Sequence, residues 1–197
     1  MALIAKKLDR EDLAEAAIVQ LRARRDNLVD DSGAIWLRAD AQGRRTYKLW
    51  ARGLTWYFLG MAKTLDVLPY QPEDLIEEFR RAAAYLVQLQ GGDDQWRVFA
   101  DDPNAAPESS GTAGIATALA IGYRNGWLGA FALESAQKAA KALESRLTPD
   151  GFLDGVAEAN KREGGETFQR STKGGVCQWG MGLYAQLVAE LDLRSKQ

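Results

Sequence analysis

Two kinds of helical segment alternate along the chain. The first kind is amphipathic and charged, as from Asp9 to about Asn27, where apolar residues recur at helical spacing. The second kind is apolar on nearly every side and rich in glycine and alanine, as between Gly111 and Gly122. A helix that is apolar all round is expected to be buried. The alternation therefore predicts hairpins in which an outer, solvated helix packs against an inner, buried one.

These hairpins form an internal repeat. The turn residues Leu28, Leu89 and Leu147 lie 61 and 58 residues apart, and each separates a charged segment from an apolar one. Self-similarity at such a period is typical of architectures that stack one unit. We predict an all-α fold in which 1–197 form a single domain. The three hairpins are expected at about 9–68, 71–126 and 129–193.

A long loop precedes each inner helix. The first loop contains a polar stretch from Asp40 to Thr46, and the third contains a glycine-rich stretch from Asn160 to Gly165. In a curved array of hairpins these loops gather on one face. Trp50, Glu108 and Cys177 are then expected to start, or nearly start, the three inner helices.

Composition narrows the classes of function. Hydrophobic residues make up 46% of the chain and charged residues 26%, as in a globular protein with a sizeable core. The net charge of −2 argues against a nucleic-acid partner or an anionic membrane. No apolar run approaches the roughly 20 residues that span a bilayer. The apolar stretch before Lys6 is too short for a signal peptide, so we expect a cytoplasmic protein.

The chain contains no histidine and only one cysteine, Cys177. An internal disulfide, a catalytic Ser-His-Asp triad, a Cys-His dyad and a histidine-ligated zinc are therefore excluded within it. Acid–base chemistry would fall to carboxylates, or less readily to tyrosine or lysine.

The segment Trp50-Ala-Arg-Gly-Leu-Thr-Trp56 is the best candidate for a binding site. It brings two indoles and a guanidinium together at the start of a predicted inner helix, where Arg52 and Trp56 share a face. Indoles stack on sugar rings, and a guanidinium with free N–H groups binds a carboxylate, so an acidic sugar is the natural ligand. The alternative is that both tryptophans belong to the core and Arg52 is an ion-pair partner.

With this segment at a helix start, the chain resembles the unsaturated uronyl hydrolases of glycoside hydrolase families 88 and 105. The similar stretches follow one another at repeat spacing over nearly the whole chain from about Asp9. They are Leu28-Val-Asp-Asp-Ser-Gly, Trp50-Ala-Arg-Gly-Leu-Thr-Trp56, Leu89-Gln-Gly-Gly-Asp-Asp-Gln-Trp96, Asp101-Asp-Pro103, Glu108-Ser-Ser-Gly-Thr-Ala113 and Leu147-Thr-Pro-Asp-Gly-Phe152. The family fold is a ring of six hairpins, an (α/α)6 barrel. The resemblance implies that three hairpins are half of such a barrel, and we expect the C-terminal half.

The resemblance also implies an activity. Family members hydrate the C4=C5 bond of a terminal unsaturated uronic acid in pectin- or glycosaminoglycan-derived oligosaccharides, with no cofactor and no metal. An aspartate protonates the double bond, water adds at C5, and the hemiketal opens. Trp50, Arg52 and Trp56 correspond to the substrate-facing group, with Arg52 as the carboxylate binder. Glu108 and Ser109 are weaker candidates for substrate binding, because an acidic residue there also suits a helix N-cap.

The family's catalytic aspartate motif is not found in this chain. Asp9 and Asp12 precede Trp50, but they lie on a predicted outer helix and in a different sequence. The catalytic residue is therefore unknown, and the chain is expected to work as a homo-oligomer or with a complementing N-terminal half. Two alternatives remain open: a non-catalytic half-barrel that binds sugars, and a helical-repeat interaction scaffold.

Overall fold

Three inner helices form one layer of the computed structural model, which describes residues 1–160, 165–171 and 174–195. They are α3 (Ala51–Val67), α5 (Ser109–Arg124) and α8 (Gln178–Ser195), and α5 packs against α3 on one side and α8 on the other. The first two are largely buried as predicted, but the last buries only one face, with Gly182, Ala185 and Val188 exposed on the other. In α5 every residue from Ser109 to Gly122 is buried. Small residues permit this close packing, because a Cβ at Gly114 would lie 2.1 Å from Cγ2 of Thr55.

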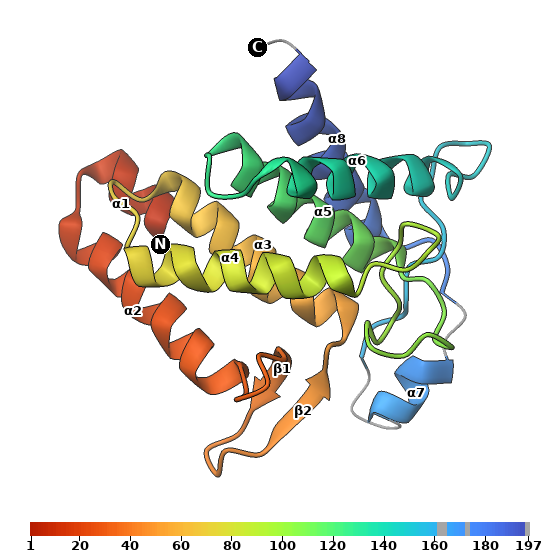
Figure 1. Cartoon of the computed structure of the whole chain (residues 1–197), viewed down its shortest axis with the longest axis horizontal. Helices are drawn as coiled ribbons and strands as arrows, with labels where there is room; N and C mark the ends of the chain where they lie inside the picture. Colours follow the sequence, from red (N-terminus) through yellow and green to blue (C-terminus); the bar gives the residue numbers. More distant parts are fainter. Residues whose placement is uncertain (161–164, 172–173, 196–197) are drawn as a thin grey trace.

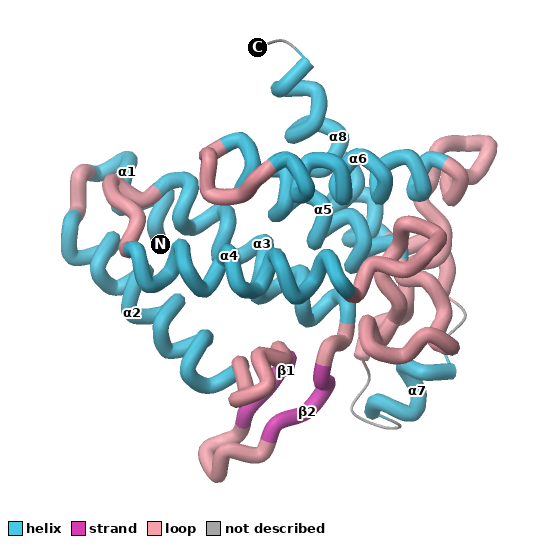
Figure 2. Tube along the Cα trace, viewed as in Figure 1, coloured by secondary structure: helices cyan, strands magenta, loops and turns pink. Residues whose placement is uncertain are grey.

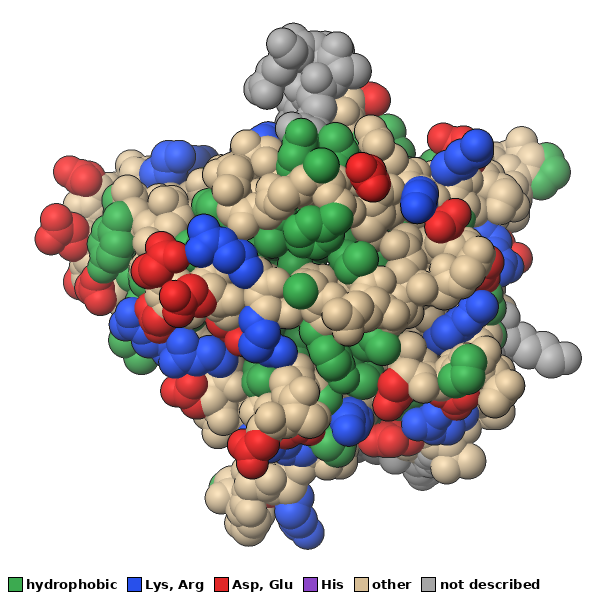
Figure 3. All heavy atoms as spheres, viewed as in Figure 1, with side chains coloured by type: hydrophobic (Ala, Val, Ile, Leu, Met, Phe, Trp, Pro, Cys, Tyr) green, Lys and Arg blue, Asp and Glu red, His purple; other side chains and the backbone are tan. Residues whose placement is uncertain are grey.

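Three charged helices lie outside this layer, and the last of them packs mainly against α5 (Figure 1). They are α2 (Glu11–Leu28), α4 (Glu73–Gln88) and α6 (Ala130–Glu144). Asp74 on α4 receives hydrogen bonds from Arg22 and Arg25 on α2, which ties two outer helices together. Side chains of both charge signs are scattered over the face shown in Figure 3, with apolar ones visible between α4 and α6.

One arginine joins the three inner helices at their C-terminal ends. Arg124 on α5 donates two hydrogen bonds to Asp66 on α3, at 3.2 and 3.1 Å, and another to Glu190 on α8. These two carboxylates raise the pKa of the arginine, and burial opposes them. The contact lies at the opposite end of α5 from Glu108.

The inner helices begin where the sequence predicts. Trp50 and Glu108 are the N-cap residues of α3 and α5, and α8 begins directly after Cys177. The loops before these helices gather at one end of the molecule, as expected (Figure 2).

The structure differs from the prediction in three places. A short helix, α1 (Ala2–Leu8), precedes α2. Asp9, where the first charged helix was expected to start, instead ends α1 in a left-handed conformation (φ 51°), and α2 begins at Glu11. The polar stretch expected as a loop from Asp40 to Thr46 is the turn of an antiparallel hairpin. Its strands are β1 (Trp36–Ala39) and β2 (Arg45–Lys48), and Arg38 pairs with Thr46.

The third difference is helix α7 (Gly165–Ser171), which begins where the glycine-rich loop was expected to end. Residues 161–164 of that predicted loop lie outside the described residues. In the part of the chain that is described, no helix is both long and apolar enough to cross a bilayer.

Candidate functional site

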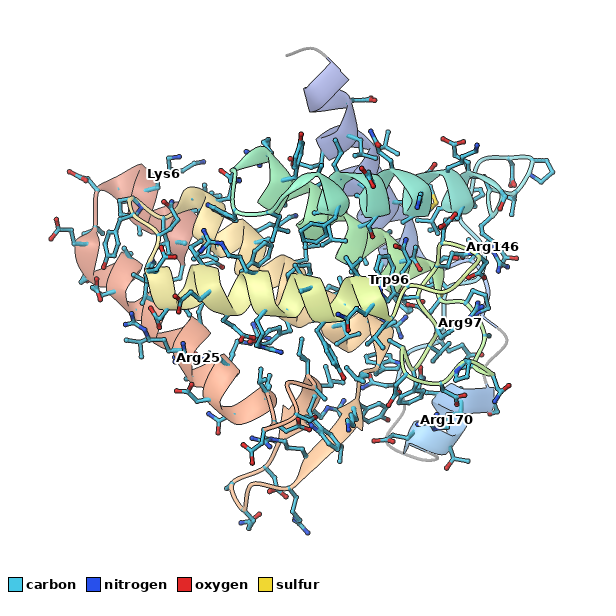
Figure 4. The ribbon with its side chains drawn as sticks, viewed as in Figure 1. Lys6, Arg25, Trp96, Arg97, Arg146 and Arg170 are labelled. Carbon is cyan, nitrogen blue, oxygen red and sulfur yellow. The ribbon has the colours of Figure 1, made fainter. Side chains whose placement is uncertain are left out.

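The first two inner helices, α3 and α5, are each held at the first turn by the loop of the following hairpin. The backbone N–H of Ala51 donates to the Val98 carbonyl at 2.9 Å, and that of Ser109 donates to the Gly155 carbonyl at 3.0 Å. Arg170 on α7 forms an ion pair with Asp102 at 2.8 Å, so α7 joins the same assembly of loops. Figure 4 shows Arg170 and Arg97 at this end of the molecule. The N-terminal ends of the inner helices therefore form one connected surface.

Arg52 lies in the wall of this surface. It is only 4% exposed, and its Nη1 and Nη2 donate to the carbonyls of Ala157 and Glu158 at 2.7 and 2.5 Å. Burial lowers the pKa of the guanidinium, and the Glu108 carboxylate, whose Oε1 lies 3.9 Å from Nη1, opposes that shift. An arginine stays protonated under such a change, so the wall carries a positive charge.

Two indoles flank this guanidinium. The Cζ atom of Arg52 lies 4.7 Å from the ring centroid of Trp50 and 5.2 Å from that of Trp179, distances typical of cation–π contacts. Trp50 is 2% exposed, and its indole N–H donates to Oε1 of Gln169 at 3.1 Å. Helices α3 and α8 thus each contribute one aromatic ring to the site.

An open pocket of about 320 Å³ lies over Arg52. Trp56 is 43% exposed, so its indole is available at the surface. The pocket is lined by Leu37, Arg38, Trp50, Arg52, Trp56, Ala159, Asn160 and Trp179. The structure therefore brings together the three residues that the sequence singled out first. The described lining contains two guanidiniums and no carboxylate.

Glu108 and Ser109 are placed differently. Both are fully buried and neither lines the pocket. The Glu108 carboxylate accepts hydrogen bonds from the backbone N–H groups of Ser110, Gly111 and Ala157, at 3.3, 2.6 and 3.0 Å. This is the geometry of the N-cap alternative. Glu108 has no oxygen exposed to the pocket, and it contributes there only as a nearby negative charge beside Arg52.

Several pocket residues were not singled out from the sequence. They are Leu37, Arg38, Ala159, Asn160 and Trp179. Trp179 had a usable signal, because it lies in the first turn of the third inner helix, as Trp50 lies at the start of the first. Nothing in the sequence marked Arg38 or Asn160, because only the folding of the hairpins brings their loops beside Arg52.

A larger cavity, of about 620 Å³, lies between α1, α2 and the connection from α3 to α4. Its charged lining already contains both signs, with Lys6 and Arg10 beside Asp9, Glu11 and Glu15. The smaller pocket is the better candidate for an acidic sugar, because its lining combines three indoles with two cations and no described carboxylate.

Stacked helical hairpins whose inner helices start at one shared surface, with an aromatic and arginine pocket there, are the architecture of the α/α-toroid class of proteins. The chain belongs to Glycosyl Hydrolase Family 88, whose family model matches residues 1–193. It is 27% identical over 204 residues to the unsaturated rhamnogalacturonyl hydrolase YesR of Bacillus subtilis, and the match covers all of this chain and 57% of that protein.

Solved structures agree on the fold. A possible member of the GH105 family from Salmonella enterica superimposes with a TM-score of 0.88 at 24% identity, over all of this chain and 54% of that one. An unsaturated glucuronyl hydrolase specific for heparin gives a TM-score of 0.80 at 15% identity, over all of this chain and 57% of its own. The expected fold, three hairpins equivalent to half of an (α/α)6 barrel, is confirmed. The chain spans little more than half the length of the relatives it matches.

Proposed function

We propose that this chain carries the substrate pocket of an unsaturated uronyl hydrolase, which hydrates the C4=C5 bond of a terminal unsaturated uronic acid in an oligosaccharide. The observation that carries the proposal is the placement of Arg52, a buried cation between two indoles in the wall of an open pocket. Such a site suits a ligand that is both ring-shaped and anionic. Family membership and the names of the relatives support the same reaction class.

Arg52 retains donors for the sugar carboxylate. Of the five N–H groups of an arginine, three donate within the described chain, to Ser110 Oγ, Ala157 O and Glu158 O. The Nε–H and one Nη N–H therefore have no acceptor among the described residues. They can bind the carboxylate while the other three keep the guanidinium in place, and Trp56 offers an exposed indole for the ring.

The reaction needs an acid that protonates C4 before water adds at C5 and the resulting hemiketal opens. No carboxylate lines the described part of the pocket, and that of Glu108 is occupied in capping α5. We infer that the acid comes from outside the described pocket, from the remainder of a longer enzyme or from a second chain.

A second copy of this chain is one source of that acid. Leu3, Ile4 and Leu8 on α1 are 53%, 53% and 63% exposed, and Val19 on α2 is 56% exposed. Stacked hairpins normally end in a polar cap, so an apolar end favours association. Light scattering at tens of micromolar tests this point. A dimer is the expected result, and a monomer contradicts it.

The function is tested with an unsaturated galacturonyl-rhamnose disaccharide, by loss of the ultraviolet absorbance of its conjugated double bond and by calorimetry. Wild type is compared with Arg52→Ala and with Arg44→Ala, whose side chain is 78% exposed. We expect Arg52→Ala to abolish binding and any turnover, and Arg44→Ala to change neither. Binding without turnover would leave a sugar-binding half-barrel, and neither binding nor turnover would leave only a scaffold.

A further inference from the structure

Arg38 is held at the pocket by a stack of side chains. It lies on β1, and its Cζ is 5.4 Å from the ring centroid of Tyr47. Tyr47 is only 5% exposed, and its ring centroid lies 5.6 Å from that of Trp50. The order Arg38, Tyr47, Trp50, Arg52 thus forms a continuous series of aromatic and cationic contacts from the exposed hairpin to the buried wall.

The backbone reinforces this placement. Tyr47 has a positive φ of 60°, which is uncommon for a bulky residue and is retained only where the surroundings determine it. Its backbone N–H donates to Oε1 of Glu166 on α7 at 2.6 Å. The ring on which Arg38 rests is therefore positioned by burial, by Trp50 and by α7.

The two pocket arginines differ in charge compensation. Arg52 is buried beside Glu108 and two carbonyls, so much of its charge is balanced within the protein. Arg38 is exposed, and no carboxylate of a described residue lies within ion-pair distance of it. On the same hairpin, Arg44 is already paired with Asp40 at 2.6 Å. Arg38 is thus a cation that ring contacts position beside the pocket, and it has no acidic partner among the described residues.

Arg52 and Arg38 lie at different depths in the pocket. Arg52 lies in the wall, whereas Arg38 and Trp56 are exposed at the rim. In the proposed function Arg52 binds the carboxylate of the terminal uronic acid. The next sugar of the chain then lies at the rim, beside the Arg38 guanidinium.

We propose that Arg38 binds an anionic group on this second sugar, so that the pocket selects oligosaccharides with adjacent acidic residues over those with a neutral second sugar. The inference rests on the proposed function and deepens it by naming the substrate class. An exposed ion pair of this kind contributes about fivefold in affinity, and salt weakens it because both groups face water.

Two ligands that differ in a single charge test the inference. One is unsaturated digalacturonate, and the other is the same disaccharide with the carboxylate of its second ring methyl-esterified. Calorimetry measures the dissociation constants of both for wild type, Arg38→Gln and Arg44→Gln, at low and high salt. Arg44→Gln is the matched control, since it removes a paired cation from the same hairpin but not from the pocket lining.

We expect wild type and Arg44→Gln to bind the diacid about fivefold more tightly than the ester at low salt. In Arg38→Gln the two ligands should bind equally, because the second carboxylate has lost its cation. Equal binding of both ligands by wild type overturns the inference. A similar loss for both ligands in Arg38→Gln also overturns it, because Arg38 would then bind the terminal carboxylate. Failure of wild type to bind the ester counts against the proposed function itself.

Discussion

Gln169 joins the two walls of the candidate site through one side-chain amide. The residue is fully buried, its oxygen accepts from the Trp50 indole N–H, and its nitrogen donates to the carbonyls of Glu158 and Ala159 at 3.2 and 3.3 Å. The Glu158 carbonyl is also an acceptor for Arg52. At the scale of single residues, α7 thus sets the positions of Trp50 and of the segment that holds Arg52.

Gln169→Leu keeps much of the side-chain volume and leaves the Trp50 indole N–H and two carbonyls without this partner. Unsatisfied buried groups of this kind cost about 1–3 kcal/mol each. We therefore expect the free energy of unfolding to fall by about 2–4 kcal/mol, measured by urea denaturation. Gln178→Leu, at an exposed position on α8, is the control and should change it by less than about 0.5 kcal/mol. Equal effects of the two variants would contradict this role of Gln169.

Asp30, in the turn before β1, makes the stability of the protein depend on pH. Burial raises the pKa of its carboxyl, but hydrogen bonds from Ser32, Trp36 and Ala34 outweigh burial and lower the pKa to about 2. The unfolded value is about 3.9, so this stabilisation is complete above roughly pH 5 and is lost as the pH falls through 2. We expect Asp30→Asn to cost about 1 kcal/mol at pH 7 and almost nothing near pH 2, measured by denaturation across that range.

Asp31→Asn provides the matched control for this pH dependence. The Asp31 side chain is exposed, and its carboxylate accepts no hydrogen bond from a described residue. Its substitution should leave stability nearly unchanged at every pH. If the Asp30→Asn difference stayed constant down to pH 2, the carboxylate charge would not be the cause.

At the scale of elements, the contact between α3 and α5 depends on a missing side chain. A Cβ at Gly114 would lie 2.1, 2.5 and 2.8 Å from three atoms of Thr55. Alanine normally stabilises a helix interior by up to about 1 kcal/mol relative to glycine. Here the overlap separates the helices, so we expect Gly114→Ala to destabilise the protein by about 1–3 kcal/mol in thermal or urea denaturation.

Gly60 on α3 is the matched control for that substitution. A Cβ there would have no neighbour within 4 Å. We expect Gly60→Ala to raise stability by a few tenths of a kcal/mol up to about 1 kcal/mol. Adding Thr55→Ala to Gly114→Ala should recover part of the loss, since it removes the two nearest overlapping atoms, Cγ2 and Oγ1, and leaves only Cβ. A Gly114→Ala protein as stable as wild type would show that the two helices can shift at little cost.

The helices differ in how far the sequence alone predicts them. The starts of α3 and α5 were predictable because long apolar segments follow Trp50 and Glu108. Helices α1 and α7 have seven residues each, too few for a hydrophobic period to show. Strands β1 and β2 have four residues each, and their pairing across the Asp40–Gly43 turn depends on contacts with the rest of the fold.

The candidate site divides in the same way. Trp50, Arg52 and Trp56 were predictable because they lie within one local segment, on a helix start that the repeat identifies. Arg38 and Gln169 were not, because their importance comes from contacts with Tyr47 and Trp50 that form only when the loops fold over the helix starts. Local chemistry is visible in the sequence, whereas the partners of a buried group depend on the packing.

At the scale of the whole molecule, the inner helices are joined at both ends by an arginine. Arg52 and Glu108 connect α3 to the start of α5, and Arg124 connects α5 to Asp66 and Glu190 at the far end. The length of α5, 16 residues, separates the two arrangements by roughly 24 Å. Stability at the far end and binding at the pocket can therefore be altered independently.

Arg124→Met leaves Asp66 and Glu190, with side chains 25% and 10% exposed, without their shared arginine, although Lys6 still acts on Asp66. Breaking a buried pair costs about 3–5 kcal/mol, and the partial exposure here reduces the expected loss of unfolding free energy to about 2–3 kcal/mol. In wild type, burial raises the pKa of the Asp66 carboxyl, but the hydrogen bonds from Arg124 and Asn125 outweigh burial and lower the pKa. The loss should therefore shrink as the pH falls and the Asp66 carboxyl becomes protonated. Arg80→Met, which breaks an exposed pair with Glu73, should cost less than about 1 kcal/mol.

The Arg124→Met/Glu190→Gln double variant separates repulsion from lost packing. If the two carboxylates repel each other, the double variant should be more stable than Arg124→Met by about 1 kcal/mol at pH 7, because one negative charge is gone. Both variants should keep the wild-type affinity for the unsaturated disaccharide wherever they remain folded, since the pocket lies at the other end of α5. A parallel loss of affinity and stability would instead mean that the three inner helices transmit changes along their whole length to Arg52.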